Sequence, residues 1–140
     1  MKKIMLVGQN RSGKRAVIRN CFDENYNSKR ALAVEYHGCF INTPSEFLEN
    51  RLFYPALITT SAECDILVML QNATHVTSLF PPCFGSMFNR KVIGLITNAE
   101  AEDAKIERAE RFLHEAGARE IFCVNFTSKR DIETLRKMFL

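Results

Sequence analysis

One stretch near the start of the sequence identifies the fold, because it fits the pattern G-x-x-x-x-G-K: Gly8-Gln9-Asn10-Arg11-Ser12-Gly13-Lys14. It stands between Ile4–Val7, an apolar run typical of a buried strand, and Lys14–Phe22, whose apolar positions predict a helix. In that context the backbone N–H groups of the loop surround a phosphate, and the helix N-terminus and the lysine add positive charge. The alternative is a glycine-rich turn with a solvated lysine. The residues predicted to bind a nucleotide or phosphate are Gly8, Gln9, Asn10, Arg11, Ser12, Gly13, Lys14 and Arg15.

Further along the chain, short apolar runs alternate with amphipathic helical stretches. Unbroken apolar runs separated by helices indicate a mostly parallel sheet covered by helices on both faces, a three-layer α/β fold. No repeat, low-complexity tract or linker divides the chain, so we predict one domain over residues 1–140. The predicted strands are Val34–Ile41, Ile66–Leu70, Val92–Ile96 and Ile121–Val124, and the predicted helices are Phe53–Ser61, Glu100–Gly117 and a last one that starts at Ser128.

The composition is that of an ordinary globular protein, with 46% hydrophobic and 25% charged residues. The net charge of +3 is small and the basic residues are scattered, which argues against nucleic acid as a partner. No apolar stretch approaches the length of a membrane span, so we expect a cytoplasmic protein without a membrane partner. Five isolated cysteines indicate reduced thiols and no metal site. Cys39, Cys64 and Cys123 lie in or beside apolar runs and are expected to be buried.

The residue after the motif, Arg15, replaces the serine or threonine whose hydroxyl usually binds Mg²⁺. A guanidinium has no free lone pair and stays protonated, so it cannot ligate a metal. Two placements are open for Arg15: it points into solvent, or it takes the place of the missing cation against phosphate oxygens.

Several stretches spread over nearly the whole chain match one known pattern, of which Glu46-Phe47-Leu48-Glu49-Asn50-Arg51 is the most specific. The others are Ile4–Gly8, Ala33–Tyr36, Thr43–Pro44, Phe53–Tyr54, Phe80–Pro82, Ser86–Asn89, Val92–Gly94, Glu115–Ala118 and Glu120–Phe122. They resemble the EutP/PduV family, the G-protein-like accessory proteins of ethanolamine- and propanediol-utilisation microcompartments. The resemblance implies a Ras-like P-loop NTPase fold with five or six strands. It also implies association with a bacterial microcompartment, whose shell or enzyme proteins would be the partners.

Departures from the family's pattern fall on the metal site. The family's Asp-Thr-Pro-Gly becomes Asn42-Thr43-Pro44-Ser45, so an amide replaces the carboxylate of the Mg²⁺ shell and a serine replaces the glycine near the γ-phosphate. The metal-linked threonine of the first switch aligns with Ala31. With Arg15, these changes remove the protein groups expected near the metal. Glu46 stands where related G proteins place a water-positioning residue, and it is either a general base or a solvated carboxylate.

The family's base-recognition positions are changed as well. Its Thr-Lys-x-Asp becomes Thr97-Asn98-Ala99-Glu100, where Asn98 lacks the charge of lysine and Glu100 is one methylene longer than aspartate. The later Ser-Ala loop becomes Asn125-Phe126, whose ring either fills the base pocket or borders it. Losing charge-assisted hydrogen bonds to the base costs about 1.5–3 kcal/mol of binding free energy.

These features lead to two functional interpretations. The first is a non-catalytic interaction module, a pseudo-GTPase that requires no cofactor, binds ATP or GTP weakly and has impaired Mg²⁺ binding. In this interpretation Glu46–Tyr54 either contacts a partner or packs the following helix. The alternative is an active ATP- or GTP-dependent enzyme, a slow NTPase or the acetate-kinase-like phosphotransferase that the resemblance implies. The sequence leaves open a third function, sensing of phosphate or an acyl phosphate, and it does not predict the oligomeric state.

Overall fold

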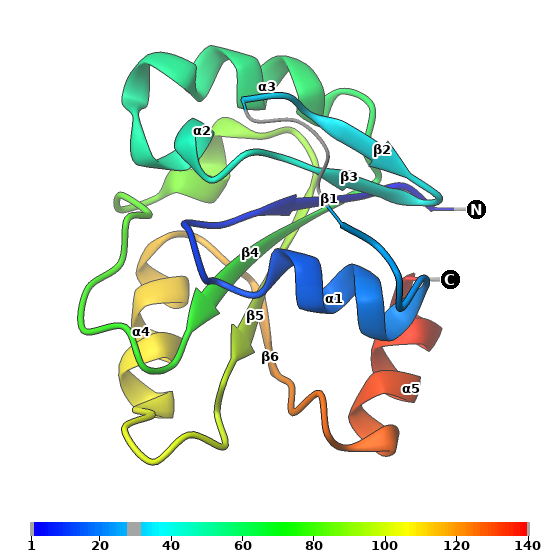
Figure 1. Cartoon of the computed structure of the whole chain (residues 1–140). Coiled ribbons are helices and arrows are strands. Elements are labelled where there is room, and N and C mark those ends of the chain that lie inside the picture. Colours follow the sequence, from blue (N-terminus) through cyan, green and yellow to red (C-terminus); the bar gives the residue numbers. More distant parts are fainter. Residues whose placement is uncertain (1, 28–31, 140) are drawn as a thin grey trace.

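The computed structural model describes residues 2–27 and 32–139. The described residues form a six-stranded sheet in the order β2-β3-β1-β4-β5-β6 (Figure 1). Neighbouring strands are parallel except β2 and β3. This arrangement confirms the predicted α/β fold with a mostly parallel sheet. The strands are β1 (Ile4–Val7), β2 (Glu35–His37), β3 (Phe40–Asn42), β4 (Ile66–Asn72), β5 (Lys91–Thr97) and β6 (Glu120–Cys123).

Strands β2 and β3 form a hairpin where the sequence predicted one strand, Val34–Ile41. Gly38 turns the chain between them with a φ of 61°, in the left-handed region that favours glycine. A Cβ added to Gly38 would also lie only 2.5 Å from Cζ of Phe22. The prediction of one continuous strand is therefore wrong, because this glycine marks a turn inside an otherwise strand-like run. The hairpin places the end of β3, Asn42, beside β1.

The long helix in the second half of the chain begins later than predicted. Residues 99–103 form turns instead of helix, in which the N–H of Ala101 donates to the carbonyl of Asn98. The N–H of Lys105 then donates to the carbonyl of Ala73 at 2.8 Å, which fixes the start of the helix near the end of β4. The helices are α1 (Lys14–Cys21), α2 (Glu46–Glu49), α3 (Tyr54–Ser61), α4 (Ile106–Glu115) and α5 (Lys129–Phe139), with 3-10 segments η1 (Arg51–Phe53) and η2 (Phe84–Met87). Within the described ranges, none of these helices is long and apolar enough to cross a membrane.

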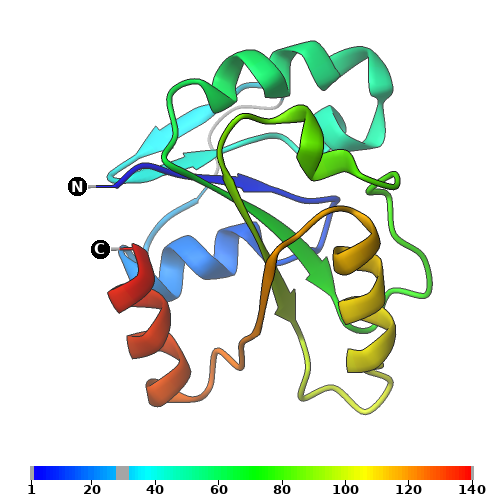
Figure 2. The same ribbon diagram turned by 180° about the vertical axis from the view of Figure 1, so that it is seen from behind.

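Side chains of the central strands alternate between two apolar cores, one on each face of the sheet. In β4, Ile66, Val68 and Leu70 join the core that contains residues of α1 and α5, whereas Leu67 and Met69 join the core that contains residues of α3 and α4. Figure 1 shows α1 and α5 as neighbours, and Figure 2 shows α4 against the sheet from behind. Both faces of the sheet are covered, as predicted.

The burial of the cysteines follows their position in the sheet. Cys39 and Cys64 are buried, as predicted, whereas Cys123 is exposed. Cys123 is the last residue of β6, an edge strand whose residues are at most half-buried. The predicted burial of Cys123 is therefore wrong, because apolar neighbours in the sequence do not bury a residue at the edge of a sheet.

Candidate functional site

The phosphate loop joins β1 to α1 and requires glycine at both ends. A Cβ on Gly8 would lie 2.2 Å from Oγ of Ser12, and a Cβ on Gly13 would lie 2.9 Å from Cγ2 of Thr97. Gly13 also has a φ of 109°, which side-chain-bearing residues rarely adopt. The two glycines of the motif therefore let the loop close on itself and against the end of β5.

Two buried side chains from the sheet hold the loop in place. The hydroxyl of Thr97, at the end of β5, donates to the carbonyl of Ser12 at 2.6 Å. The amide nitrogen of Asn72, at the end of β4, donates to the carbonyl of Arg11 at 2.9 Å. Because these bonds fix two consecutive carbonyls of the loop, the shape of the loop is set by the sheet.

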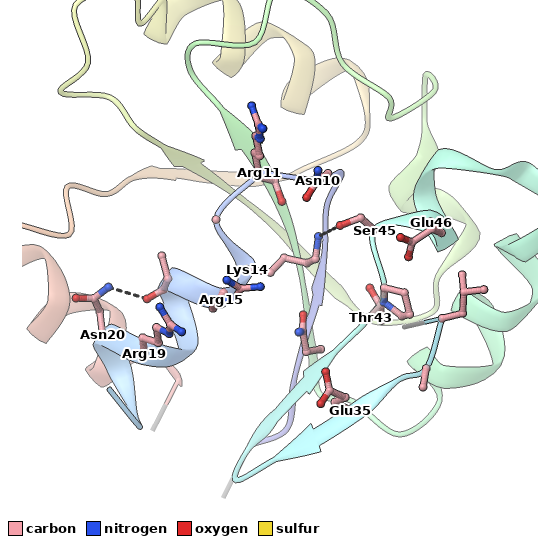
Figure 3. A pocket seen from close by; sticks show the side chains of 17 residues that line it. Asn10, Arg11, Lys14, Arg15, Arg19, Asn20, Glu35, Thr43, Ser45 and Glu46 are labelled. Carbon is pink, nitrogen blue, oxygen red and sulfur yellow. Dashed lines mark hydrogen bonds between the residues drawn. The ribbon is translucent and has the colours of Figure 1, made fainter. Parts of the chain in front are cut away.

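Lys14 is the central charged group of the site. Its ammonium group donates to the carbonyl of Gly8 and, at 2.9 Å, to Oγ of Ser45 (Figure 3). The side chain is buried, and burial lowers the pKa of Lys14 from 10.5 to about 8, although the carboxylates of Glu49 and Glu46 act in the opposite direction. A buried cation whose protein partners are neutral oxygens is well placed to attract an anion.

A cavity of about 640 Å³ lies beside Lys14, between α1 and the segment that follows β3. Thr43 anchors that segment, since its hydroxyl donates to the carbonyl of Leu6 at 2.7 Å. Ser45, which replaces the glycine of the family, supplies the hydroxyl that Lys14 binds from across the space (Figure 3). The cavity is lined by Asn10–Ala16, Arg19, Asn20, Leu32, Ala33, Glu35 and Asn42–Glu46.

The two sides of the cavity carry opposite charges. Arg15 and Arg19 line it from α1, whereas Glu35 and Glu46 line it from the β2 and α2 side. Arg11 extends from the loop away from these arginines (Figure 3). Arg15 is exposed at the cavity, so both predicted placements of its guanidinium fit this position. An anion would therefore bind on the α1 side, where the cations and the start of the helix lie.

Two of the positions expected near Mg²⁺, Arg15 and Asn42, lie among the described residues. The amide nitrogen of Asn42 donates to the hydroxyl of Tyr26 at 2.9 Å, and the buried Asn42 amide oxygen has no hydrogen-bond partner among the described residues. Arg15 supplies a cation where a metal ligand is required. Ala31 lies outside the described residues. In residues 2–27 and 32–139, no group of three or more Asp, Glu, His or Cys side chains could hold a metal. At the described positions, Arg15 therefore supplies no Mg²⁺ ligand, and Asn42 offers a neutral amide where the family's pattern has a carboxylate.

The base-recognition positions lie outside the lining of this cavity. Asn98 and Glu100 are exposed between β5 and α4. The amide oxygen of Asn125 accepts hydrogen bonds from the N–H and the hydroxyl of Thr127, at 2.9 and 2.6 Å, and is thus used within its own turn. Phe126 packs against the core that contains α1 and α5. The structure therefore does not gather these positions around the pocket that contains Lys14.

The segment Glu46–Tyr54 both packs and exposes side chains. Phe47 and Leu48 are buried, and the ring of Phe47 stacks on that of Phe53 with centroids 4.9 Å apart. Leu52, in contrast, is 84% exposed. The packing alternative is therefore confirmed for Phe47, Leu48 and Phe53, while Leu52 is free to meet solvent or a partner.

Sequence reasoning missed three contacts of the phosphate loop. From the sequence, Thr97 belongs to the base-recognition stretch, yet its hydroxyl binds the carbonyl of Ser12. Glu49 belongs to the family-like stretch, yet its carboxylate accepts a hydrogen bond from the N–H of Asn10 at 3.0 Å. No pattern in the sequence indicated either contact. Asn72 could have been found, because it is a polar residue that ends a parallel strand at the carboxyl edge, where ligands bind in such sheets.

Comparisons with known proteins identify relatives over the full length. The PduV-EutP family model, described as ethanolamine utilisation - propanediol utilisation, matches residues 1–140. Propanediol utilization protein PduV of Citrobacter freundii is 36% identical over 141 residues, which cover 100% of this chain and 92% of the relative. Probable acetate kinase EutP of Salmonella typhimurium is 32% identical over 140 residues, which cover 96% of this chain and 87% of the relative.

A solved structure supports the fold. The FeoB G-domain from Methanococcus jannaschii matches with a TM-score of 0.63, covering 98% of this chain and 94% of that domain at 16% identity. At such low identity the likeness shows the fold alone. The sheet order, the loop between β1 and α1 and the family match agree with one another. This chain therefore belongs to the PduV-EutP family of ethanolamine- and propanediol-utilisation proteins and has the G-domain fold of P-loop proteins.

Proposed function

We propose that this chain is a pseudo-GTPase: it binds a phosphate-bearing anion without Mg²⁺ and serves as a cytoplasmic accessory module of ethanolamine- or propanediol-type catabolism. The observation that carries the proposal is a contrast within one cavity. Lys14 and the phosphate loop are fully formed, whereas Arg15 and Asn42 stand where a metal would need ligands. The family description and the PduV relative support the metabolic setting. A bacterial microcompartment is the proposed site of action, as the family resemblance implies.

Anion binding requires only groups that this chain has. Lys14 supplies a buried ammonium, Arg15 a second cation at the same cavity, and the start of α1 a set of backbone donors. Phosphoryl transfer also requires stabilisation of the charge on the moving group, which Mg²⁺ provides in G proteins. Removing one electrostatic donor from an active site typically costs about 2.7–4 kcal/mol of the barrier. A site without the metal ligands is therefore expected to turn over very slowly at best.

Recognition of the nucleotide base is also expected to be weak, because the side chains that would contact the base are not placed at the cavity. Asn98 and Glu100 are exposed and Asn125 is engaged with Thr127, so none of them lines the cavity. ATP and GTP should thus bind with similar affinity, dominated by their phosphates.

The accessory role needs a surface for a partner, and we place it at η1. Arg51 and Leu52 are both exposed there, on a segment that Phe47 and Leu48 fix to the core. Shell or enzyme proteins of a microcompartment are the proposed partners. In a pull-down with purified shell and enzyme proteins of the pathway, the double variant Arg51→Ala/Leu52→Asp should lose the partner. The control Glu133→Ala, at an exposed position of α5, should keep it. Retention of every partner by the double variant would exclude this surface.

Calorimetric titration of the nucleotide-stripped protein tests the central claim. Orthophosphate, ATP and GTP are each titrated with Mg²⁺ and with EDTA. We expect binding that Lys14→Ala abolishes, that Mg²⁺ does not strengthen, and that is not accompanied by nucleotide turnover. Magnesium-dependent binding at about micromolar affinity, together with turnover that Lys14→Ala abolishes, would contradict the proposal.

A second candidate is a phosphotransferase that moves a phosphoryl group from ATP to acetate. It is favoured by the EutP relative, named a probable acetate kinase, and by Glu46, which lines the cavity that contains Lys14. Formation of acetyl phosphate from ATP and acetate, trapped as the hydroxamate, is the assay. Activity that Lys14→Ala abolishes, Glu46→Gln lowers and the control Glu133→Gln leaves intact would replace the pseudo-GTPase proposal by this one.

A further inference from the structure

The phosphate loop holds a carboxylate of the same chain. Oε2 of Glu49, the last residue of α2, accepts a hydrogen bond from the backbone N–H of Asn10 at 3.0 Å. Asn10 is the third residue of the motif and lines the cavity. One backbone donor of an anion-binding loop is thus already bound by an anionic group, through a contact between segments 39 residues apart in the chain.

The backbone around Glu49 is fixed, so the carboxylate is presented by a packed turn. The N–H of Glu49 donates to the carbonyl of Ser45 at 3.1 Å, and the preceding residues Phe47 and Leu48 are buried. The carboxylate also attracts the ammonium of Lys14, as does that of Glu46. Of these two carboxylates, Glu49 is the one that contacts a backbone donor of the loop.

The other donors of the site lie at the start of α1. The N–H of Val17 donates to the carbonyl of Gly13 at 3.0 Å and closes the first turn of the helix. The N–H groups of Lys14, Arg15 and Ala16 come before that bond, and a helix leaves such groups without partners inside it. All three residues line the cavity. The site therefore has an inner part, at Lys14 and the helix start, and an outer part, at Asn10, where Glu49 binds.

We propose that Glu49 sets the length of the phosphate chain that the site accepts. A single phosphate group binds at the inner part and leaves Glu49 in place, whereas a longer polyphosphate must displace Glu49 from Asn10. The ligand class is therefore a monophosphate or a similarly short phosphate anion, and a triphosphate is disfavoured. This inference rests on the proposed anion-binding function of the same loop.

The test is a series of anions of increasing length in EDTA. Orthophosphate, pyrophosphate and tripolyphosphate are titrated by calorimetry into the wild-type protein, Glu49→Ala and the charge-matched control Glu46→Ala. Glu49→Ala should strengthen tripolyphosphate binding about tenfold or more, because the free energy of one hydrogen bond to a charged group corresponds to about that change in affinity. The same variant should change orthophosphate binding by less than about threefold. Glu46→Ala removes the same charge without a contact to a loop amide, so its gain for tripolyphosphate should be clearly smaller than that of Glu49→Ala. An equal gain for all three anions in Glu49→Ala would overturn the proposal.

A second readout reports on the contact without any ligand. A carboxylate acceptor shifts an amide proton downfield, so the Asn10 amide should move upfield in Glu49→Gln more than any other amide of the loop. If orthophosphate binds through Lys14 but Glu49→Ala changes nothing and the Asn10 amide does not move, this inference fails while the proposed function stands. If no anion binds the wild type or any variant, both fail.

Discussion

The phosphate end and the base end of this molecule lie at the carboxyl edge of one sheet, yet they differ in what their side chains do. At the phosphate end, side chains from several elements converge: Thr97 and Asn72 hold the loop, and Ser45 meets Lys14. At the base end, Asn125 bonds its own turn. The first region is organised around a cavity and the second around its own local structure.

The difference shows which kind of site tolerates a change of sequence. A phosphate loop consists mainly of backbone N–H groups and a glycine-dependent path, so it needs few specific side chains. Base recognition and metal binding depend on individual carboxylates, hydroxyls and lysines, and each is lost by a single substitution. A chain can therefore retain the first while it loses the second. Substitutions at the two ends of the molecule can test that separation.

Lys14→Met should give the largest effect and should act on binding and stability in opposite directions. Folding holds the Lys14 pKa at about 8 instead of 10.5, so below pH 8 the native state carries a disfavoured buried charge. Removing it should raise the free energy of unfolding at pH 7 by up to about 3 kcal/mol, while anion binding is lost. Urea denaturation and calorimetry measure the two effects.

The lowered pKa of Lys14 also predicts that the free energy of unfolding depends on pH. Between about pH 8 and 10.5 the unfolded chain retains the Lys14 proton that the folded chain releases, so the stability of the wild type should rise with pH relative to Lys14→Met. Taking the difference between the two proteins cancels the other titrating groups. A difference that stays constant across this range would mean that Lys14 is not destabilised by burial.

Gly13→Ala should destabilise the fold through the loop itself. The φ of 109° and the 2.9 Å approach of the new Cβ to Thr97 both oppose a side chain, and we expect a loss of about 2 kcal/mol or more in urea denaturation. Gly117→Ala is the matched control, because its φ of 97° is also left-handed but its nearest contact is 3.5 Å. The control should cost about 1 kcal/mol. Equal losses would show that the contact with Thr97 is unimportant.

Asn125→Ala should reveal that the base end serves stability and not ligand binding. Loss of the two hydrogen bonds from Thr127 should lower the free energy of unfolding by about 1 kcal/mol. The affinities for ATP and GTP should not change beyond experimental error. A selective loss of GTP affinity would instead make Asn125 a ligand contact and remove the contrast between the two ends.

Asn98→Lys should have the smallest effect, although it restores the lysine of the family's base motif. Asn98 is exposed and lies outside the cavity, and a surface side chain typically contributes within about 0.5 kcal/mol. GTP affinity should therefore change by less than about twofold. Because Asn98 has a φ of 56°, which asparagine tolerates well, a small loss of stability is expected alongside.

The sequence predicted those parts of the molecule that local rules control. The motif predicted the loop, and the apolar runs that alternate with helical stretches along the chain predicted the parallel strands and the coverage of both faces of the sheet. The turn at Gly38 had a local signal, because a glycine interrupts a strand-like run there. The late start of α4 instead depends on a contact with Ala73, distant in sequence, so a local pattern does not reveal it. The Glu49–Asn10 contact was unpredictable for the same reason.

The bonds from Thr97 and Asn72 to the loop carbonyls have a thermodynamic consequence. A loop that the strands already hold in shape loses little conformational freedom when an anion arrives, so little of the binding free energy is spent on ordering. Calorimetry should accordingly report a small entropic penalty for orthophosphate binding.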